Sequence, residues 1–391
     1  MNILFLDWPC FCKVDTILTF RELGHKVDTF FHKDYIEPES EAYDEAFTQT
    51  IKNKHYDILF SYNFYPHTAA LCHQWDITYV SFIYDSPFVG IYSEESFLPT
   101  NRIFHFDSSE VDRLTALGHR NIYYMPLPVN GKVINTLLTK PYNKKRVSSD
   151  ISLVGALYTE SNNFYDQMKS LSDYTKGYLS SLMSVQGTLY GVDIIEKSLT
   201  PDIIGDMEHS FKCTGNISGI ESPAYIYGNY VVARKLTAIE RSEYMASIGA
   251  HFKDKSVKLF TLDASTNIPN VTNMGVADYY SEMPYVFNNS MINLNISLRS
   301  IHSGIPLRAM DILGNGGFLL TNYQSDFLRH FEPDIDFVYY DSKEDLLDKI
   351  DYYLNHEDLR KSIAASGHRK VIANHNFNII LSQILDLVFA K

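Results

Sequence analysis

Cysteine is scarce in this chain of 391 residues, which contains only Cys10, Cys12, Cys72 and Cys213. None of them has the paired spacing of a structural zinc site, and Cys10 and Cys12 form a lone C-x-C. The H-E-x-x-H pattern of zinc hydrolases is also missing. We therefore expect free thiols that hold no metal.

Long apolar runs are missing as well. No uninterrupted run approaches the roughly 20 residues that cross a membrane. The N-terminal sequence MNILFLDWPC lacks a basic start and a small-residue cleavage site, so it predicts a strand rather than a signal peptide. These features predict a cytoplasmic protein with no integral membrane segment.

Positive charge is in the minority, since 34 Lys and Arg face 47 Asp and Glu and give a net charge of −13. This balance argues against nucleic acid as a partner, because such proteins need a basic face. The chain also lacks GxxxxGK[ST], a GxGxxG that opens a helix after the first strand, and GxSxG. These absences argue against P-loop, nicotinamide-dependent and serine-hydrolase functions.

What the chain does contain is a regular alternation of strand-like and helix-like segments. Strands spaced by helices predict parallel sheets with crossovers, and hence an α/β fold. Asp7, Asn63, Asp85 and Asp107 directly follow predicted strands, so all four should lie at the carboxyl edge of one sheet. The strands predicted for this first part are 2–6, 27–31, 57–61, 78–83, 102–106 and 122–124.

The second part of the chain repeats this alternation after a polar linker near residues 130–150. A strand at 150–154 runs into Gly155, and a long helical stretch at 163–251 separates it from the next strand. The length is sufficient for two domains. Further strands are predicted at 257–262, 271–274, 291–296, 318–321 and 337–340, with a last helix at 378–389.

Three charges stand out in the segment 293–322, NLNISLRSIHSGIPLRAMDILGNGGFLLTN. It predicts one strand–loop–helix–strand unit that carries Arg299, Arg308 and Asp311. An arginine fork beside a helix N-terminus suits a phosphate group, and an acid one turn later can accept from ribose hydroxyls. The alternative is that the arginines pair with surface acids.

This segment resembles the donor-binding segment of GT-B glycosyltransferases, in particular the CgeB-like group. The resemblance continues through 331–333, 338–340 and 351–354, and in the N-terminal third through 5–8 and 104–107. It implies a first Rossmann-like domain at 1–135, on the acceptor side. It implies a second at 150–375, which binds the nucleotide sugar, carries the helical insertion and faces the first across a cleft. The last segment, 376–391, would return to the first domain.

The resemblance also implies a set of donor-binding residues. Retaining GT-B enzymes carry two glutamates eight positions apart here; aligning Asp311 with the second places Ser303 at the first, so one acid is missing. Whether the reaction retains or inverts the anomeric configuration is therefore open. The implied residues are Gly155, Arg299, Ser303, Gly304, Ile305, Pro306, Leu307, Arg308 and Asp311.

Three functions fit this resemblance. The first is transfer of a sugar from a nucleotide sugar, with UDP as the expected nucleotide, to a glycan or protein hydroxyl. The others are a non-catalytic GT-B binding module or partner subunit and a UDP-sugar 2-epimerase. No cofactor or metal is required, because protein donors can meet the charge of the leaving diphosphate. Asp334-Ile335-Asp336 is formally a D-x-D but is expected to be an exposed acidic turn. The sequence does not predict the oligomeric state.

An inverting transferase would also need a general base. Asp85 is the candidate, with His105 and Asp107 behind it. Each has a structural alternative: Asp85 as a turn residue before Ser86-Pro87, His105 as a core residue of a strand, and Asp107 as the acid at the start of a helix.

Overall fold

The computed structural model describes residues 1–130, 140–159, 163–213, 222–263 and 266–390. The chain forms two compact units. Of the described residues, the first unit holds 1–128, 222 and 375–390, and the second holds the others between 129 and 374. The predicted linker and the predicted end of the first domain fall partly on 131–139, outside the described residues.

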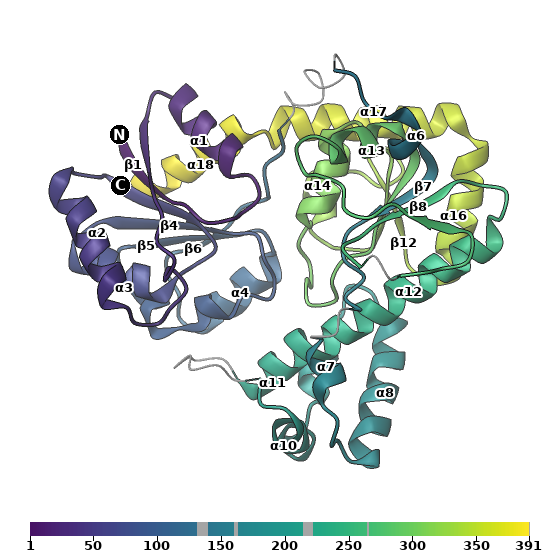
Figure 1. The fold of residues 1–391 in the computed structure, drawn as a ribbon, viewed down its shortest axis with the longest axis horizontal. Helices are drawn as coiled ribbons and strands as arrows, with labels where there is room; N and C mark the ends of the chain where they lie inside the picture. The colour runs from purple at the N-terminus through teal and green to yellow at the C-terminus, as the bar shows by residue number, and fades with distance from the viewer. Residues whose placement is uncertain (131–139, 160–162, 214–221, 264–265, 391) are drawn as a thin grey trace. The chain divides into compact units, whose positions relative to one another are not determined.

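The first unit is built on a six-stranded parallel sheet of order β2-β1-β3-β4-β5-β6. Helices α2, α3 and α4 cover one face, and α1 and α18 cover the other (Figure 1). Because both faces are covered, whole strands are apolar and buried, as in β1. The strands are β1 (Asn2–Leu6), β2 (Lys26–Phe30), β3 (Ile58–Tyr62), β4 (Thr78–Ile83), β5 (Asn101–His105) and β6 (Ile122–Tyr124); the helices are α1 (Lys13–Glu22), α2 (Glu41–Asn53), α3 (Pro66–Gln74), α4 (Ser108–Ala116) and α18 (Phe377–Phe389), with short 3-10 turns at Val89–Tyr92 and Glu94–Phe97.

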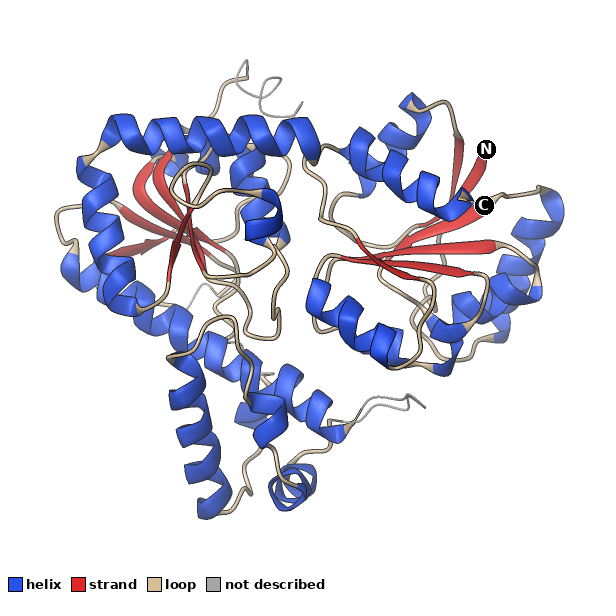
Figure 2. Cartoon of the chain, turned by 180° about the vertical axis from the view of Figure 1, so that it is seen from behind, coloured by secondary structure: helices blue, strands red, loops and turns tan. Residues whose placement is uncertain are grey.

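The second unit holds another six-stranded parallel sheet, of order β12-β11-β10-β7-β8-β9. Helices α13, α14 and α17 lie on one face, and α12 and α16 on the other (Figures 1 and 2). The strands are β7 (Ser149–Val154), β8 (Val257–Phe260), β9 (Val271–Asn273), β10 (Ser290–Asn295), β11 (Leu319–Asn322) and β12 (Val338–Tyr340); the helices on the sheet are α6 (Lys144–Val147), α12 (Arg234–His251), α13 (Met283–Asn289), α14 (Leu307–Gly314), α15 (Phe327–His330), α16 (Lys343–Asn355) and α17 (Glu357–Asn374).

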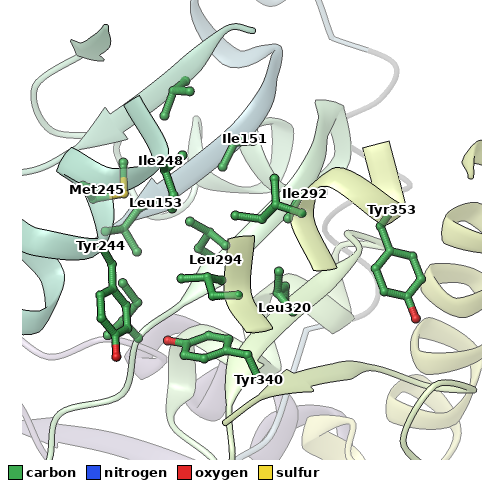
Figure 3. Close-up of a cluster of buried hydrophobic side chains, with 14 of the residues drawn as sticks. Ile151, Leu153, Tyr244, Met245, Ile248, Ile292, Leu294, Leu320, Tyr340 and Tyr353 are labelled. Carbon is green, nitrogen blue, oxygen red and sulfur yellow. The ribbon is translucent and has the colours of Figure 1, made fainter. Parts of the chain in front are cut away.

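The core of the second unit joins the central strands to helix α12. Leu153 and Leu294 lie at most 2% exposed, and Tyr244 and Ile248 of α12 pack against the same cluster (Figure 3). Fully burying one such side chain contributes about 1.5–3 kcal/mol. This packing fixes the second half of α12 on the sheet.

The predicted helical stretch at 163–251 contains several helices joined by short irregular segments in its described part. It forms a small bundle with its own apolar core, in which Leu179, Met207 and Val231 are fully buried. Helix α12 contributes Leu236 to this core and Ile248 to the core of the sheet, so one helix connects the two. The other helices are α7 (Phe164–Gln167), α8 (Asp173–Gly187), α9 (Ile195–Ser198), α10 (Pro201–Ser210), α11 (Pro223–Ile226) and a π-helical segment, Tyr227–Ala233.

The strands and helices predicted within the described residues are present, and most of their ends lie within one or two positions of the prediction. Asp107 caps α4, because its carboxylate accepts from the Ser109 N–H at 3.0 Å, in line with its predicted structural alternative at the start of a helix. None of the described helices combines the length and apolarity needed to cross a membrane.

Candidate functional site

The second sheet has its topological switch point between β7 and β10. The chain continues from β7 to β8 on one side and from β10 to β11 on the other, so the loops after these two strands diverge. In open parallel sheets ligands bind at this position. We call it the second edge, and it comprises residues 155–159 after β7, residues 296–306 after β10, and the first turn of α14.

Helix α14 begins at the second edge without a side-chain cap. Pro306 occupies the N-cap, and its carbonyl accepts from the N–H groups of Ala309 and Met310 at 3.0 and 3.3 Å. The N–H groups of Leu307 and Arg308 precede these, in the part of a helix where donors lack intrahelical acceptors. This helix start therefore favours an anion.

Arg308 lies in the first turn of α14 and is 22% exposed. Its Nη1 lies 3.2 Å from Asp311 Oδ2 and 2.9 Å from Met283 Sδ. Its Nε and Nη2 have no hydrogen-bond partner among the described residues. Asp311 also accepts from the Tyr279 hydroxyl at 3.1 Å. Arg308 is therefore held in place through Nη1 while three N–H donors stay available.

Arg299 is placed differently from the prediction. Its guanidinium forms an ion pair with Glu240 of α12, and the two side chains are 8% and 7% exposed. It also donates to the carbonyls of Leu189 at 2.7 Å and Gly187 at 3.3 Å, and it lies 4.1 Å from the centre of the Tyr190 ring. Burial alone would lower the pKa of Arg299, but the contact with Glu240 raises it. We therefore correct the predicted phosphate contact: Arg299 joins the loop after β10 to the helical bundle.

Arg241 of α12 is a second-edge cation that sequence reasoning missed. It is 8% exposed. It donates from Nε to the Ile296 carbonyl at 2.9 Å, from Nη2 to the same oxygen, and from Nη1 to the Ala156 carbonyl. No carboxylate forms an ion pair with it among the described residues. Burial lowers the pKa of this guanidinium, yet an arginine stays charged in proteins. Arg241 is thus a buried positive charge that forms no ion pair within the described residues, although the nearby charge of Glu240 raises its pKa and so opposes the effect of burial.

The loop after β7 packs closely around the Arg241 guanidinium. A Cβ at Gly155 would lie 3.4 Å from Arg241 Nη1, a tight contact. Tyr158 adopts a φ of 58°, which is strained for a side chain of this size. Its ring lies 4.4 Å from the guanidinium of Arg234 and 4.8 Å from that of Arg241. Strained residues persist where the surroundings fix them, and they cluster at ligand sites.

The predicted segment from Ser303 to Leu307 is mostly buried, including Gly304. The Ser303 hydroxyl lies 3.2 Å from Asp326 Oδ2. The backbone carbonyl of Ser303 accepts from the Asp326 N–H at 3.0 Å. Ile305 is 2% exposed. The side chains of this segment therefore hold the loop, and a ligand would meet its backbone.

Asp85 follows β4 at the carboxyl edge of the first sheet. It is exposed, and it accepts from Asn63 Nδ2 at 2.7 Å. Desolvation by the surrounding protein raises the pKa of the Asp85 carboxyl above its ordinary value, and the Asn63 hydrogen bond opposes this shift. An exposed carboxylate with a raised pKa suits proton transfer. Its role as a general base stays a prediction.

His105 and Asp107 are both fully buried, unlike Asp85. His105 Nδ1 accepts from the Asp107 N–H at 3.0 Å, and burial lowers its pKa to about 4. Asp107 caps α4. We therefore correct their predicted part in catalysis: both shape the turn from β5 into α4 and neither reaches solvent.

The D-x-D sequence also differs from expectation, because Asp336 is buried and bonded to Lys370 Nζ at 2.6 Å and to Ser366 Oγ at 2.8 Å. Only Asp334 and Ile335 are exposed. Across the described part of the chain, no three His, Cys, Asp or Glu side chains are grouped so as to hold a metal ion.

Comparisons with known proteins identify a family match and structures of similar fold. Residues 236–386 match the model of a family described as glycosyl transferase-like. A search of curated proteins found no match. The matched residues run from α12 through most of α18, so they include Arg241, Arg308 and Asp311.

Solved structures of similar fold cover nearly the whole chain. A glycosyltransferase from Rickettsia africae is 11% identical with a TM-score of 0.53, over 99% of this chain and 97% of that one. Anabaena HepE in complex with UDP and glucose is 10% identical (TM-score 0.51), and the phage T4 enzyme BGT in complex with UDP-glucose is 12% identical (0.50), each over 100% of both chains. These likenesses confirm the predicted GT-B type of fold.

Proposed function

We propose that this chain, whose residues 236–386 match the glycosyl transferase-like family, transfers a sugar from a UDP-linked donor to a glycan or protein hydroxyl without a metal ion. The neighbours of similar fold include proteins in complex with UDP, glucose or UDP-glucose. The acceptor class and the independence from metal are part of the proposal.

The observation that carries the proposal is the buried charge of Arg241. A buried charge without a partner is costly, and the expected compensation is an anion that binds beside it. Arg308 offers three N–H donors at the same edge, and its charge lowers the pKa of Arg241, so the two cations interact. A diphosphate supplies further negative charge beside the two arginines, of which only Arg308 forms an ion pair, and α14 presents its N-terminus to it.

The other residues of the second edge take supporting parts. Asp311, held by Arg308 and Tyr279, accepts from the ribose hydroxyls of the nucleotide. Gly155 lets the backbone approach the donor closely. The backbone of residues 303–306 borders the same ligand. Arg299 holds this loop against α12 through Glu240.

The transfer breaks the bond between the anomeric carbon and the diphosphate oxygen, and UDP leaves with the bonding electrons. Arg241 and Arg308 stabilise the charge that develops on the leaving oxygen. A new bond forms between the anomeric carbon and the acceptor oxygen. The acceptor proton passes to Asp85 in an inverting reaction, or to the leaving phosphate in a retaining one.

Calorimetry with UDP tests the site. Arg308→Ala should weaken UDP binding about 10- to 150-fold, because a charge-assisted hydrogen bond contributes about 1.5–3 kcal/mol. Arg146→Ala is the matched control, since Arg146 is similarly exposed and also pairs with an acid, Glu282. Arg146 precedes β7 and therefore lies at the end of this strand opposite to the second edge. If Arg308→Ala bound UDP as tightly as the wild type, the proposed UDP site would be ruled out.

Turnover then tests the reaction. Incubation with UDP-sugars should release UDP, and added acceptors should speed the release. UDP binding with no release would show a binding module instead. A new UDP-sugar epimer without transfer would show an epimerase.

A further inference from the structure

The first sheet has a switch point of its own, between β1 and β3. The chain moves from β1 to β2 on one side and from β3 to β4 on the other, so the loops after β1 and β3 diverge at the carboxyl edge. We call this place the first edge. It presents Asp7 and Trp8 after β1 and residues 63–65 after β3.

Four aromatic side chains meet at the first edge, and we call them the aromatic patch: Trp8, Tyr35, Tyr65 and Tyr84. The Trp8 ring lies 6.1 Å from that of Tyr35 and 6.3 Å from that of Tyr84, with angles of only 20° and 21° between the planes. Tyr65 meets Trp8 and Tyr35 edge-on, at 80° and 77°. Trp8 is thus nearly parallel to two tyrosine rings, and Tyr65 supports Trp8 and Tyr35 edge-on.

The patch is fixed in place rather than loosely packed. Trp8 donates from Nε1 to the Tyr62 carbonyl at 3.2 Å. The Asp7 N–H bonds to the Phe30 carbonyl at 2.7 Å, and the Asn63 N–H bonds to the Phe82 carbonyl at 3.0 Å, so both loops extend the sheet ladder. A site built in this way has little flexibility to lose on binding.

The patch also remains accessible. Trp8, Tyr35 and Tyr84 are half-buried, whereas the supporting Tyr65 is 7% exposed. Phe31, which directly follows β2, is 60% exposed at the same edge. A core needs no such exposure, and grouped exposed aromatic rings mark binding surfaces.

Polar groups border the rings. Asp85 directly follows Tyr84 and is exposed. Asp7 is 28% exposed and bonds Lys13 Nζ at 2.6 Å. Burial raises the pKa of Tyr35, so its hydroxyl stays protonated. The first edge thus combines flat apolar rings with carboxylate acceptors.

We propose that the aromatic patch binds a pyranose ring of the acceptor, so that the acceptor is a saccharide rather than a polypeptide. The inference rests on the proposed transferase function and names the substrate class of its second site. One face of a pyranose ring carries C–H groups that stack on the rings of Trp8 and its neighbours. Its hydroxyls donate to Asp7 and Asp85. Few convergent polar groups among aromatic side chains are typical of small-molecule sites.

The chain contains two tryptophans, Trp8 and Trp75, which permits a direct test. Trp75→Phe leaves Trp8 as the only indole. Titration of this variant with methyl glucosides, methyl galactosides and their disaccharides should change the emission saturably. The matched variant, Trp8→Phe, retains only Trp75 and should not respond.

Kinetics supply a second readout. Trp8→Ala should raise the KM for the best saccharide acceptor at least tenfold and leave the Kd for UDP within twofold, while Trp8→Phe keeps most of the affinity because a ring remains. Absence of any saccharide response at Trp8 would overturn the inference, as would a saturable response to a serine- and threonine-containing peptide alone. Because UDP binding is measured separately at the second edge, its failure would refute the proposed function and leave the saccharide result readable.

Discussion

The two parallel sheets share a construction but present opposite chemistry at their carboxyl edges. Each has six strands and one switch point, yet β1 and β3 flank it in the first sheet and β7 and β10 in the second. The second edge carries Arg308 and the buried Arg241. The first edge carries Trp8, Asp7 and Asp85. Cations suit a nucleotide diphosphate, whereas rings and carboxylates suit neutral hydroxyl compounds.

This difference lies in the loops and not in the strands. The central strands of both sheets, such as β3 and β7, are largely buried because helices cover both faces. The residues that differ follow the strands by one to a few positions, or come from a helix packed across the strand ends, as Arg241 does. Each edge can therefore be changed without disturbing the sheet below it.

The largest effect is expected at the first edge. Asp85→Asn keeps the shape and the possible contact with Asn63 but removes the base. Transfer to the acceptor should fall about 10²- to 10⁴-fold, while UDP affinity at the second edge stays the same. Because the pKa of Asp85 is raised, the wild-type rate should rise with pH through a value above the ordinary one for aspartate. The variant should not show this rise of the transfer rate with pH. A transfer rate close to wild type would show that the leaving phosphate takes the proton.

Within the second unit, we expect Arg299 to contribute to stability and Arg308 to contribute to UDP binding. Arg299→Ala leaves Glu240 buried without its partner, and such changes cost about 3–5 kcal/mol of unfolding free energy. Urea unfolding should show this loss, and the double variant Arg299→Met with Glu240→Met should recover much of it. UDP affinity of the protein that remains folded should change little. A large loss of UDP affinity with an unchanged unfolding free energy would instead show that Arg299 binds the phosphate.

The sequence predicts the fold well for a physical reason. Alternating apolar runs and amphipathic helices specify parallel sheets locally, and the resemblance extends over both halves. The site is harder to predict, because spacing does not show which charges pair. Arg299 and Arg308 look equivalent in the sequence, yet Glu240, 59 positions away, buries one of them. Arg241 carries no local signal, since only the packing of α12 brings it to Ile296 and Ala156.

A moderate effect is expected for Asp311. Asp311→Asn removes the charge that pairs with Arg308 and the acceptor proposed for the ribose. UDP affinity should fall about tenfold or more, since a hydrogen bond to a charged group contributes about 1.5–3 kcal/mol. The matched measurement uses inorganic diphosphate, which has no ribose. If Asp311 contacts the ribose, the variant should lose affinity for UDP but not for diphosphate; equal losses would mean that it acts through Arg308.

The smallest predicted effect is the change in the unfolding free energy of the first unit as the pH falls. Burial lowers the pKa of His105 and His119 to about 4, against about 6.5 in an unfolded chain. Between these values the unfolded state binds more protons, so the unfolding free energy should fall as pH drops, by at most about 1.4 kcal/mol per pH unit for each histidine. The raised pKa of Asp85 acts in the opposite sense and limits the slope.

Both tryptophans lie in the first unit, so their fluorescence during urea unfolding reports on it alone. His105→Asn retains an acceptor near the position of Nδ1, which bonds the Asp107 N–H, but it cannot titrate. Its unfolding midpoint should therefore change less than that of the wild type between pH 7 and pH 5. Equal slopes in the two proteins would show that His105 does not contribute to the acid sensitivity of this unit, and that its burial serves the turn into α4 alone.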